Sequence, residues 1–207
     1  GRPDLQTAVA FLTTRVKNPD IDDMKKLKRA IAYVRETIEL VLTLETDKLM
    51  NIYWWVDASF AVHPDAKSHT GGTMSLGGGL IYSASRKQKL NTRSSTEAEL
   101  VGVDDMMAQV LWTWYFMLEQ GYELKDNIIY QDNQSAIKLE NNGRHSSGKR
   151  TRHLKIRFFF VTDRIGAKEI NIEYCPTELL IADFFTKPLQ GAQFRKLRNA
   201  ILNIKDG

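Results

Sequence analysis

The first 50 residues carry a helical pattern of apolar positions. From residue 21 onward, apolar residues recur alternately three and four positions apart, with charged residues between them: Met24, Leu27, Ile31, Val34, Ile38 and Val41. This spacing predicts one amphipathic helix, and Ala8, Phe11 and Leu12 predict a shorter helix before it. Two such helices bury little apolar surface by themselves. We therefore expect the stripe to pack against the rest of the chain or against a domain that precedes it.

The pattern changes to that of strands after residue 50. Residues 52–62 are rich in aromatic and β-branched side chains, which predicts a buried strand. Proline, aspartate and glycine predict a loop over 63–72. Two further strands are predicted over 73–82 and 83–90.

The rest of the chain alternates between helices and strands. The clearest helix is predicted over 94–119, with Ser94, Ser95 and Thr96 as candidate N-caps and Glu97 as a capping residue. Shorter patterns predict a strand over 127–130, helices over 133–140 and 149–165, a strand over 169–174, and helices over 179–186 and 194–204. This order predicts an α/β fold with a mixed sheet, in which a helical segment (1–50) precedes a larger domain (51–207).

Composition indicates a folded globular protein. The 207 residues are 43% hydrophobic and 26% charged, which does not suit a disordered chain. We expect neither a membrane span, because no apolar run reaches ~18 residues, nor a signal peptide. The single cysteine, Cys175, excludes an intramolecular disulfide and a cysteine-based zinc cluster, and we expect it to be packed in a strand.

Basic residues are distributed unevenly. Lysine and arginine exceed aspartate and glutamate by only 29 to 25, but residues 66–96 and 141–162 contain no acidic side chain. Such blocks are typical of surfaces that bind a polyanion, although a solvated basic face would give the same pattern.

Four carboxylates stand out by their surroundings. Asp57 lies inside an apolar strand, where a buried carboxylate is costly unless it is paired, hydrogen-bonded, protonated or bound to a metal ion. Asp132 can be explained as a helix N-cap, Glu99 as an acid near the positive end of a helix, and Asp183 as an exposed helix residue. If the four converge, their repulsion requires positive charge, and their oxygens suit Mg²⁺ or Mn²⁺.

The motifs that contain these acids resemble ribonuclease H. More specifically, four blocks are similar to the ribonuclease H domain of copia-type long-terminal-repeat retrotransposons: Lys87–Glu99, Asp132–Ile137, Lys149–Arg157 and Ala182–Leu189. The resemblance extends over about residues 50–205, and residues 2–48 resemble the end of the reverse transcriptase and its connection in the same polyprotein. It implies a ribonuclease H-like mixed five-stranded sheet flanked by helices and preceded by a small helical segment.

The resemblance also implies an activity. The expected protein is an endoribonuclease that hydrolyses the RNA strand of RNA–DNA hybrids during retrotransposon reverse transcription, with two Mg²⁺ ions (Mn²⁺ may replace them) and a 5′-phosphate product. The metal-binding catalytic acids would be Asp57, Glu99, Asp132 and Asp183, where Glu99 rather than Glu97 matches because it directly precedes the leucine of the motif. The expected partner is the upstream reverse transcriptase, and the expected location is a cytoplasmic virus-like particle or the nucleus.

Further residues are candidates for substrate contacts and catalysis. Polar side chains that could read the 2′-hydroxyls of RNA are Ser59, Asn91, Ser94, Ser95, Asn133 and Gln134. Basic candidates for nucleic-acid contacts are Arg93, Lys149, Arg150, Arg152, Lys155 and Arg157. Many ribonucleases H have a histidine shortly before the last acid; residues 174–182 contain none, so His153 is the candidate substitute. His63 and His69 are expected to be exposed in a loop.

Two alternative functions remain open from the sequence. One is a catalytically weak module that binds hybrids and supports an upstream reverse transcriptase, although all four acids are present. The other is an integrase- or transposase-like nuclease, although those enzymes usually carry three acids.

Overall fold

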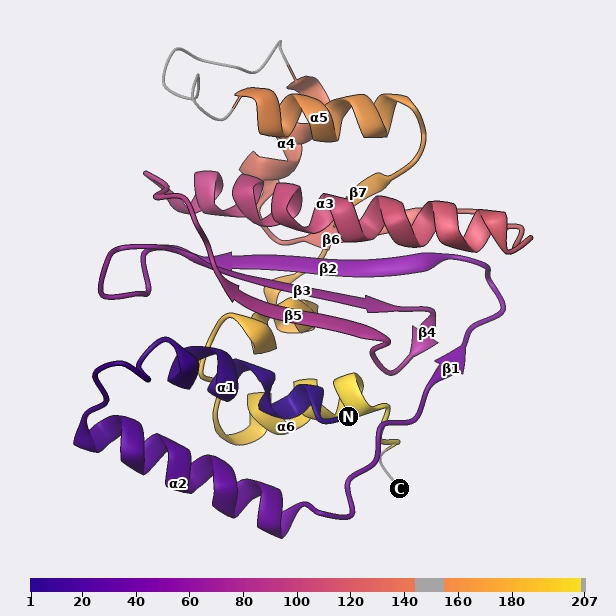
Figure 1. Cartoon of the computed structure of the whole chain (residues 1–207). Helices are drawn as coiled ribbons and strands as arrows, with labels where there is room; N and C mark the ends of the chain where they lie inside the picture. The colour runs from indigo at the N-terminus through magenta and orange to yellow at the C-terminus, as the bar shows by residue number, and fades with distance from the viewer. Residues whose placement is uncertain (144–154, 206–207) are drawn as a thin grey trace.

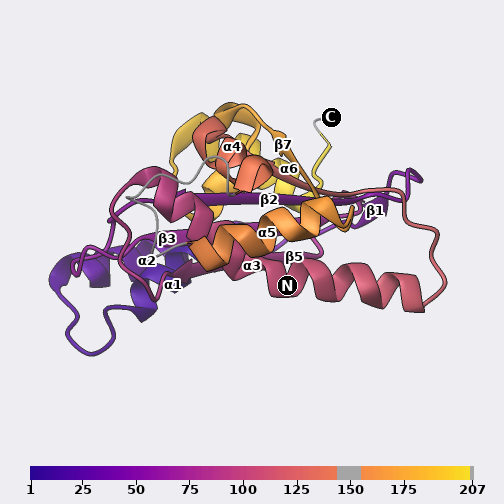
Figure 2. The ribbon, with the colours of Figure 1, turned by 90° about the horizontal axis from the view of Figure 1, so that it is seen from above.

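The computed structural model describes residues 1–143 and 155–205, which form three layers with a sheet between two groups of helices (Figure 1). The strands, helices and short 3-10 helices (η) are η1 Pro3–Leu5, α1 Gln6–Thr13, α2 Ile21–Glu36, β1 Glu45–Thr46, β2 Ile52–Ser59, β3 His69–Ser75, β4 Gly77–Gly78, β5 Tyr82–Lys87, α3 Ser95–Glu119, β6 Asn127–Gln131, α4 Gln134–Asn142, α5 Lys155–Gly166, β7 Asn171–Tyr174, η4 Thr177–Leu179, η5 Ile181–Phe185 and α6 Gly191–Leu202. Helices α3, α4 and α5 cover one face of the sheet, as Figure 2 shows from above, and α1 and α6 lie on the other.

The five-stranded sheet is built around β2. Its strand order is β5-β3-β2-β6-β7. The β5, β3 and β2 strands are antiparallel neighbours, whereas β6 runs parallel to both β2 and β7. Alternate residues of β2, namely Ile52, Trp54 and Val56, are fully buried, as expected for side chains that point to one covered face. The predicted mixed five-stranded sheet is confirmed.

Helix α3 confirms the longest predicted helix. It starts after Ser94, whose side chain accepts a hydrogen bond from the Glu97 backbone N–H. Its buried stripe includes Val103, Met106 and Val110, which pack in one cluster with Trp54. Burial of side chains of this size stabilises the fold by roughly 1.5–3 kcal/mol each, so α3 is held firmly along the sheet.

The N-terminal helix α1 packs on the opposite face of the sheet. The Gln6 side chain donates to the Ser83 carbonyl oxygen of β5 (3.0 Å) and accepts from the Ser83 hydroxyl (2.6 Å). Nearby, Phe184 of η5 and Leu197 of α6 belong to a second hydrophobic cluster. The first residues of the chain therefore contact the larger domain directly.

Helix α2 is the outermost element (Figure 1), and its apolar stripe is exposed. Met24, Leu27 and Ile31 are 51%, 41% and 59% exposed. The helix ends at Glu36, before Ile38 and Val41, which are also exposed. Of the two expected alternatives, packing against the rest of this chain is wrong, and packing against a preceding domain stays a prediction.

Polar contacts hold the other side of α2. The Asp23 carboxylate lies 3.1 Å from the Arg15 guanidinium, and the Tyr33 hydroxyl donates to Asp4 (2.8 Å). Arg2 pairs with the same Asp4 carboxylate at 2.7 Å. The stripe is exposed because these charged and polar residues, and not the apolar ones, face the body of the protein.

The two loop histidines, expected to be exposed, are buried. His63 Nε2 lies 3.0 Å from His69 Nδ1, and His69 Nε2 lies 2.8 Å from the Ser85 hydroxyl. The ring of Phe11 in α1 stacks on both imidazoles. Burial lowers both pKa values, that of His69 to about 4, so the pair is neutral at pH 7. β3 starts at His69, earlier than predicted, because the antiparallel pairing with β2 begins opposite Ser59, the last residue of β2.

The later elements follow the predicted order with one change. The segment over 179–186 forms no single helix; it is divided between η4 and η5. Cys175 is buried next to β7, as expected. Across residues 1–143 and 155–205, no helix has both the length and the hydropathy required to cross a bilayer.

Candidate metal and nucleic-acid site

Three acidic side chains meet at one edge of the sheet. Asp57 lies toward the end of β2, Asp132 directly follows β6, and Glu99 lies in the second turn of α3. Because β2 and β6 are parallel neighbours, their carboxyl ends share this edge. One carboxylate oxygen from each of the three residues lies within 4.8 Å of the others.

Asp183 of η5 joins this group through Lys187. The Lys187 ammonium lies 2.5 Å from Asp183 Oδ1 and 3.8 Å from Asp57 Oδ2, and the Thr186 hydroxyl donates to the same Asp57 oxygen. Asp183 is only 6% exposed, so its explanation as an exposed helix residue is wrong. We define the acid group as Asp57, Glu99, Asp132 and Asp183.

The N-cap explanation for Asp132 is also wrong. Asn133 caps α4, because its side-chain oxygen accepts hydrogen bonds from the backbone N–H groups of Ser135 and Ala136. The Asp132 carboxylate instead accepts a hydrogen bond from the Thr177 hydroxyl (2.7 Å). Asp132 therefore does not cap α4.

Burial and repulsion from neighbouring carboxylates raise the pKa values of Asp57 and Glu99. Burial raises the pKa of Asp57 to about 6; Lys187 opposes this shift, and the charges of Asp183 and Asp132 add to it. Burial likewise raises the pKa of Glu99 well above its usual value, with Asp57 and Asp132 acting in the same direction. Within the described part of the chain, Glu99 Oε2 is buried without a hydrogen-bond partner. Crowded carboxylates with an unsatisfied oxygen fit a divalent cation, which supplies opposite charge and takes oxygen ligands.

Gly71 allows η5 to approach the sheet, a role that the sequence pattern did not reveal. Gly71 pairs with Asp57 in the β2–β3 register. A Cβ atom at Gly71 would lie 2.7 Å from the Ala182 carbonyl oxygen and 2.8 Å from the Thr186 side chain. Only a residue without a side chain lets the segment with Asp183 lie this close to Asp57. The glycine pair at 71–72 is the one local sign of this close approach. The same pair predicts a loop, whereas the structure places both glycines in β3.

Two further hydroxyls fix η5. The Thr7 hydroxyl of α1 donates to the Phe184 carbonyl oxygen (2.6 Å), and the Ser85 hydroxyl donates to the Phe185 carbonyl oxygen (2.7 Å). The position of Asp183 thus depends on a residue from the first helix of the chain. No local pattern of residues indicates this contact.

The predicted nucleic-acid contacts fall into three groups. Exposed residues lie before α3 or at the start of α3 and α4: Asn91, Arg93, Ser94, Ser95 and Gln134. Ser59 is buried, and its hydroxyl has no hydrogen-bond partner among the described residues, while Asn133 caps α4. Lys149, Arg150, Arg152 and His153 lie outside the described residues, as does the side chain of Lys155.

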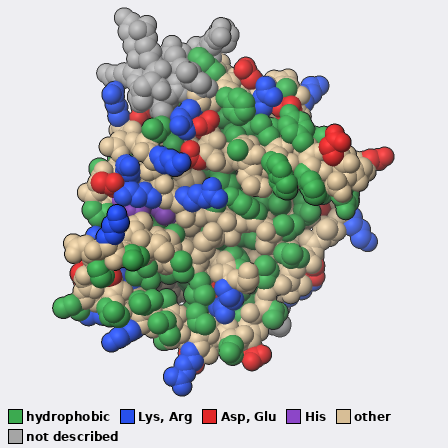
Figure 3. Space-filling model, viewed as in Figure 1, with side chains coloured by type: hydrophobic (Ala, Val, Ile, Leu, Met, Phe, Trp, Pro, Cys, Tyr) green, Lys and Arg blue, Asp and Glu red, His purple; other side chains and the backbone are tan. Residues whose placement is uncertain are grey.

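Arg157 differs from the expected free phosphate contact. Its guanidinium pairs with the Asp104 carboxylate and lies 3.5 Å from that of Asp105, both in α3. Elsewhere, Figure 3 shows lysine and arginine side chains gathered on the side of the molecule where α3 begins. Arg86, Lys89 and Arg93 are exposed within the acid-free block 66–96.

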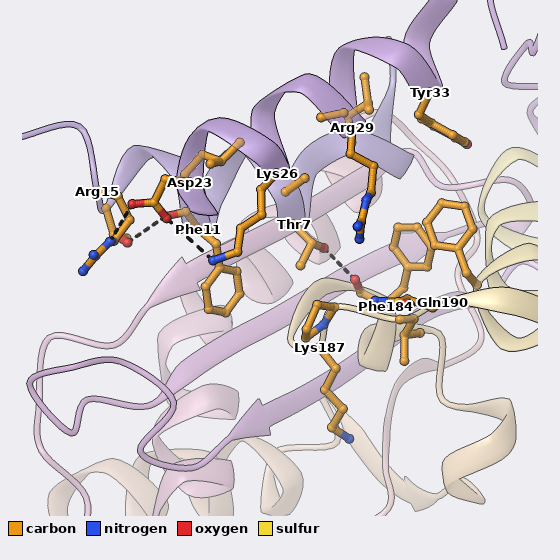
Figure 4. A pocket seen from close by; sticks show the side chains of 18 of the residues that line it. Thr7, Phe11, Arg15, Asp23, Lys26, Arg29, Tyr33, Phe184, Lys187 and Gln190 are labelled. Atoms are coloured by element: carbon orange, nitrogen blue, oxygen red, sulfur yellow. Dashed lines mark hydrogen bonds and ion pairs between the residues drawn. The ribbon is translucent and has the colours of Figure 1, made fainter. Parts of the chain in front are cut away.

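A cavity of about 760 Å³ lies between α1, α2 and the segment after η5 (Figure 4). Phe11, Tyr33 and Phe184 contribute apolar wall, and Lys26 and Arg29 reach toward it from α2. Lys187 also lines the cavity, and its side chain extends away from α2.

Comparison with known proteins finds retrovirus-related Pol polyproteins of transposons among the relatives. No protein-family model matches the chain. The chain is 28% identical over 202 residues to the retrovirus-related Pol polyprotein from transposon TNT 1-94 of Nicotiana tabacum, covering 97% of this chain and 15% of that protein. It is 30% identical over 206 residues to the retrovirus-related Pol polyprotein from transposon RE2 of Arabidopsis thaliana, covering 99% of this chain and 14% of that protein. The chain therefore spans only about one seventh of the length of these curated relatives.

Among solved structures, the chain is similar to LC11-RNase H1, isolated from compost. The two share 12% sequence identity at a TM-score of 0.49, with 65% of this chain and 91% of that chain covered.

The raised pKa of Asp57 predicts how pH affects stability when EDTA removes metal ions. An unfolded aspartate has a pKa near 3.9, so between that value and about 6 the folded protein retains a proton that the unfolded chain has released. The contribution of Asp57 to stability therefore falls as pH rises through this window. We expect the melting temperature of Asp57→Asn to exceed that of the wild type by an amount that grows from pH 5 to pH 7. A difference in melting temperature between the two proteins that stays constant from pH 5 to pH 7 would contradict the raised pKa of Asp57.

The close approach at Gly71 predicts a large effect of a small substitution. Gly71→Ala must displace η5, and we expect it to destabilise the protein by about 1–3 kcal/mol and to weaken Mn²⁺ binding. Thermal unfolding and a Mn²⁺ titration measure the two effects. Gly166→Ala is the control, because no atom lies within 4 Å of the Cβ it would add; equal behaviour of the two variants would refute the role of Gly71.

Proposed function

Since the homologues of this chain are retrovirus-related Pol polyproteins of copia-type transposons, we propose that the chain is the ribonuclease H part of such a polyprotein and hydrolyses the RNA strand of RNA–DNA hybrids. The observation that carries the proposal is the meeting of the acid group. Its four members come from β2, α3, η5 and the residue after β6, and all but Asp57 lie in a motif block that resembles this enzyme class. The reaction would leave a 5′-phosphate and a 3′-hydroxyl.

The acid group would hold two divalent ions, Mg²⁺ in this proposal and Mn²⁺ as a substitute. Asp57 interacts electrostatically with each of the other three acids, so it is the residue best suited to contact both ions. Asp132 and Asp183 would hold one ion with it, and Glu99 the other. Bound ions lower the pKa of a water molecule and neutralise charge that develops on the phosphate.

Substrate selection would rest on hydroxyl recognition and on positive charge. The Ser59 hydroxyl lies two residues beyond Asp57 and is buried without a partner among the described residues, so it would contact a 2′-hydroxyl only if the surface above it opened. Asn91, Ser94, Ser95, Asn133 and Gln134 would read the same groove. Arg93 and the basic residues of 149–157 would contact phosphates, which makes binding salt-dependent.

The relatives are polyproteins about seven times as long as this chain, which makes another part of the same polyprotein a candidate partner. We propose that the reverse transcriptase part of the same polyprotein covers the exposed α2 stripe, defined by Met24, Leu27, Ile31 and Val34. A soluble protein rarely leaves a continuous apolar surface of this kind uncovered. The assembled enzyme would act in a virus-like particle in the cytoplasm or in the nucleus.

Replacing Asp57 tests the proposed reaction. Asp57→Asn keeps the shape of the side chain and removes the charge that would hold both ions. We therefore expect the rate of hybrid cleavage to fall at least about 100-fold, as is typical when an enzyme loses one key electrostatic group. The assay uses a labelled RNA–DNA hybrid with Mg²⁺, next to RNA–RNA and DNA–DNA duplexes of the same sequence.

The matched control is Asp22→Asn, the same chemical change at an exposed aspartate that pairs with Lys25 on α2. Wild-type cleavage of the DNA duplex in preference to the hybrid would favour the integrase- or transposase-like alternative. Binding of the hybrid without cleavage would favour the catalytically weak module.

Changing the α2 stripe tests the proposed partner. The double variant Leu27→Glu, Ile31→Glu should melt at the wild-type temperature, because both side chains are exposed in this chain, and should bind the separately produced reverse transcriptase part at least about tenfold more weakly, a loss of about 1.4 kcal/mol. The control Lys28→Gln, Ala32→Glu changes the net charge by the same amount at neighbouring exposed positions. Equal loss in the control, or a wild-type chain that forms dimers through the stripe, would overturn the proposal.

A further inference from the structure

Lys187 brings a positive charge into the acid group from within the chain. It lies four residues after Asp183, and its backbone N–H donates to the Asp183 carbonyl oxygen (3.1 Å). Its ammonium contacts Asp183 Oδ1 at 2.5 Å and reaches Asp57 Oδ2 at 3.8 Å. The side chain is 41% exposed, whereas those of the two acids are 8% and 3% exposed. The lysine thus enters a buried group of acids from an open side.

Lys187 provides the direct ion pairs of this group. No other lysine or arginine whose side chain the structure describes lies within ion-pair distance of Asp57, Glu99, Asp132 or Asp183. One ammonium cannot compensate four carboxylates, which agrees with the pKa values that remain raised at Asp57 and Glu99. The site is partly neutralised, and only on the side of Asp183.

We propose that Lys187 is a built-in counter-cation: its ammonium holds Asp57 and Asp183 together in the metal-free protein and is displaced from Asp57 when a divalent ion binds. This inference rests on the proposed metal site and concerns a positioning residue. The ammonium and the ion would share Asp57 Oδ2, the oxygen that also accepts the Thr186 hydroxyl. Two cations repel each other at this distance, so binding of one must weaken the hold of the other.

The exposed side of Lys187 gives its side chain room to move. Lys187 borders the cavity of about 760 Å³ together with Pro188 and Phe194, and Figure 4 shows its side chain extending away from α2. Because 41% of this side chain is exposed, its long, flexible stem can turn into solvent. The ammonium can therefore leave Asp57 on the open side of the acid group.

A Mn²⁺ titration without nucleic acid tests the proposal. Free Mn²⁺ is followed by electron paramagnetic resonance for the wild type, Lys187→Met, Lys187→Gln and Lys187→Arg. Removal of the charge should tighten Mn²⁺ binding at least about fivefold, since a unit charge about 4 Å away repels the ion even at the dielectric constant of water. Lys187→Arg should restore affinity close to that of the wild type. The control is Lys205→Met, which breaks an exposed lysine–carboxylate pair with Glu45.

A purely structural ion pair would give a different result. In EDTA, Lys187→Met should lower the melting temperature under either hypothesis, but only displacement makes the stabilisation by Mn²⁺ larger than in the wild type. Unchanged or weaker Mn²⁺ affinity in both uncharged variants would overturn the proposal. Because this titration contains no hybrid, a failure of Lys187 to compete with metal is distinguishable from a failure of the proposed nuclease activity.

The native chain offers a second measurement that requires no substitution. If Mn²⁺ frees the ammonium, the rate at which an amine-acetylating reagent modifies Lys187 should rise severalfold on Mn²⁺ addition, measured by mass spectrometry. Lys205 should react at the same rate with and without Mn²⁺. A Lys187 rate that does not rise would contradict displacement.

Discussion

Repulsion between buried carboxylates is the constraint on which the rest of this structure depends. Asp57, Glu99 and Asp132 lie within a few ångströms of one another in an environment that penalises charge. The parallel pairing of β2 with β6 and the capped start of α3 fix their positions, so the acids cannot relax apart. The fold compensates with the Thr186 hydroxyl, the Lys187 ammonium and shifted protonation. All three compensations act on Asp57.

The fourth acid lies on the least regular of the supporting elements, and its position depends on contacts from distant parts of the chain. The 3-10 helix η5 is too short to hold Asp183 by its own hydrogen bonds. Gly71 admits it to the sheet, and Thr7 and Ser85 bind its carbonyl oxygens. Thr7 belongs to the segment that resembles the end of a reverse transcriptase. The geometry of the acid group therefore depends on residues on both sides of the boundary predicted near residue 50.

Patterns of neighbouring residues correctly predicted the features that depend on interactions close in sequence. The three- and four-residue spacing predicted α3, and the apolar surroundings of Asp57 marked it as an acid that needs a partner. What failed depended on residues far away in sequence: Phe11 buries the His63–His69 pair, and η5 needs the absence of a side chain at Gly71. The α2 stripe shows the same limit. Its periodicity correctly predicted a helix, but periodicity does not say which protein surface the apolar face meets.

Helix α2 and Lys187 border the same cavity. α2 forms one side of this space, and Lys187, which contacts Asp57 and Asp183, lines it as well. The helix is held by ion pairs and hydrogen bonds at Asp23 and Tyr33, not by a packed apolar face. Contacts of this kind contribute little individually when they are partly exposed, so α2 is the element whose position another protein surface can most readily change. The sheet and α3, by contrast, are held by the buried apolar cluster that contains Trp54, Val103 and Val110.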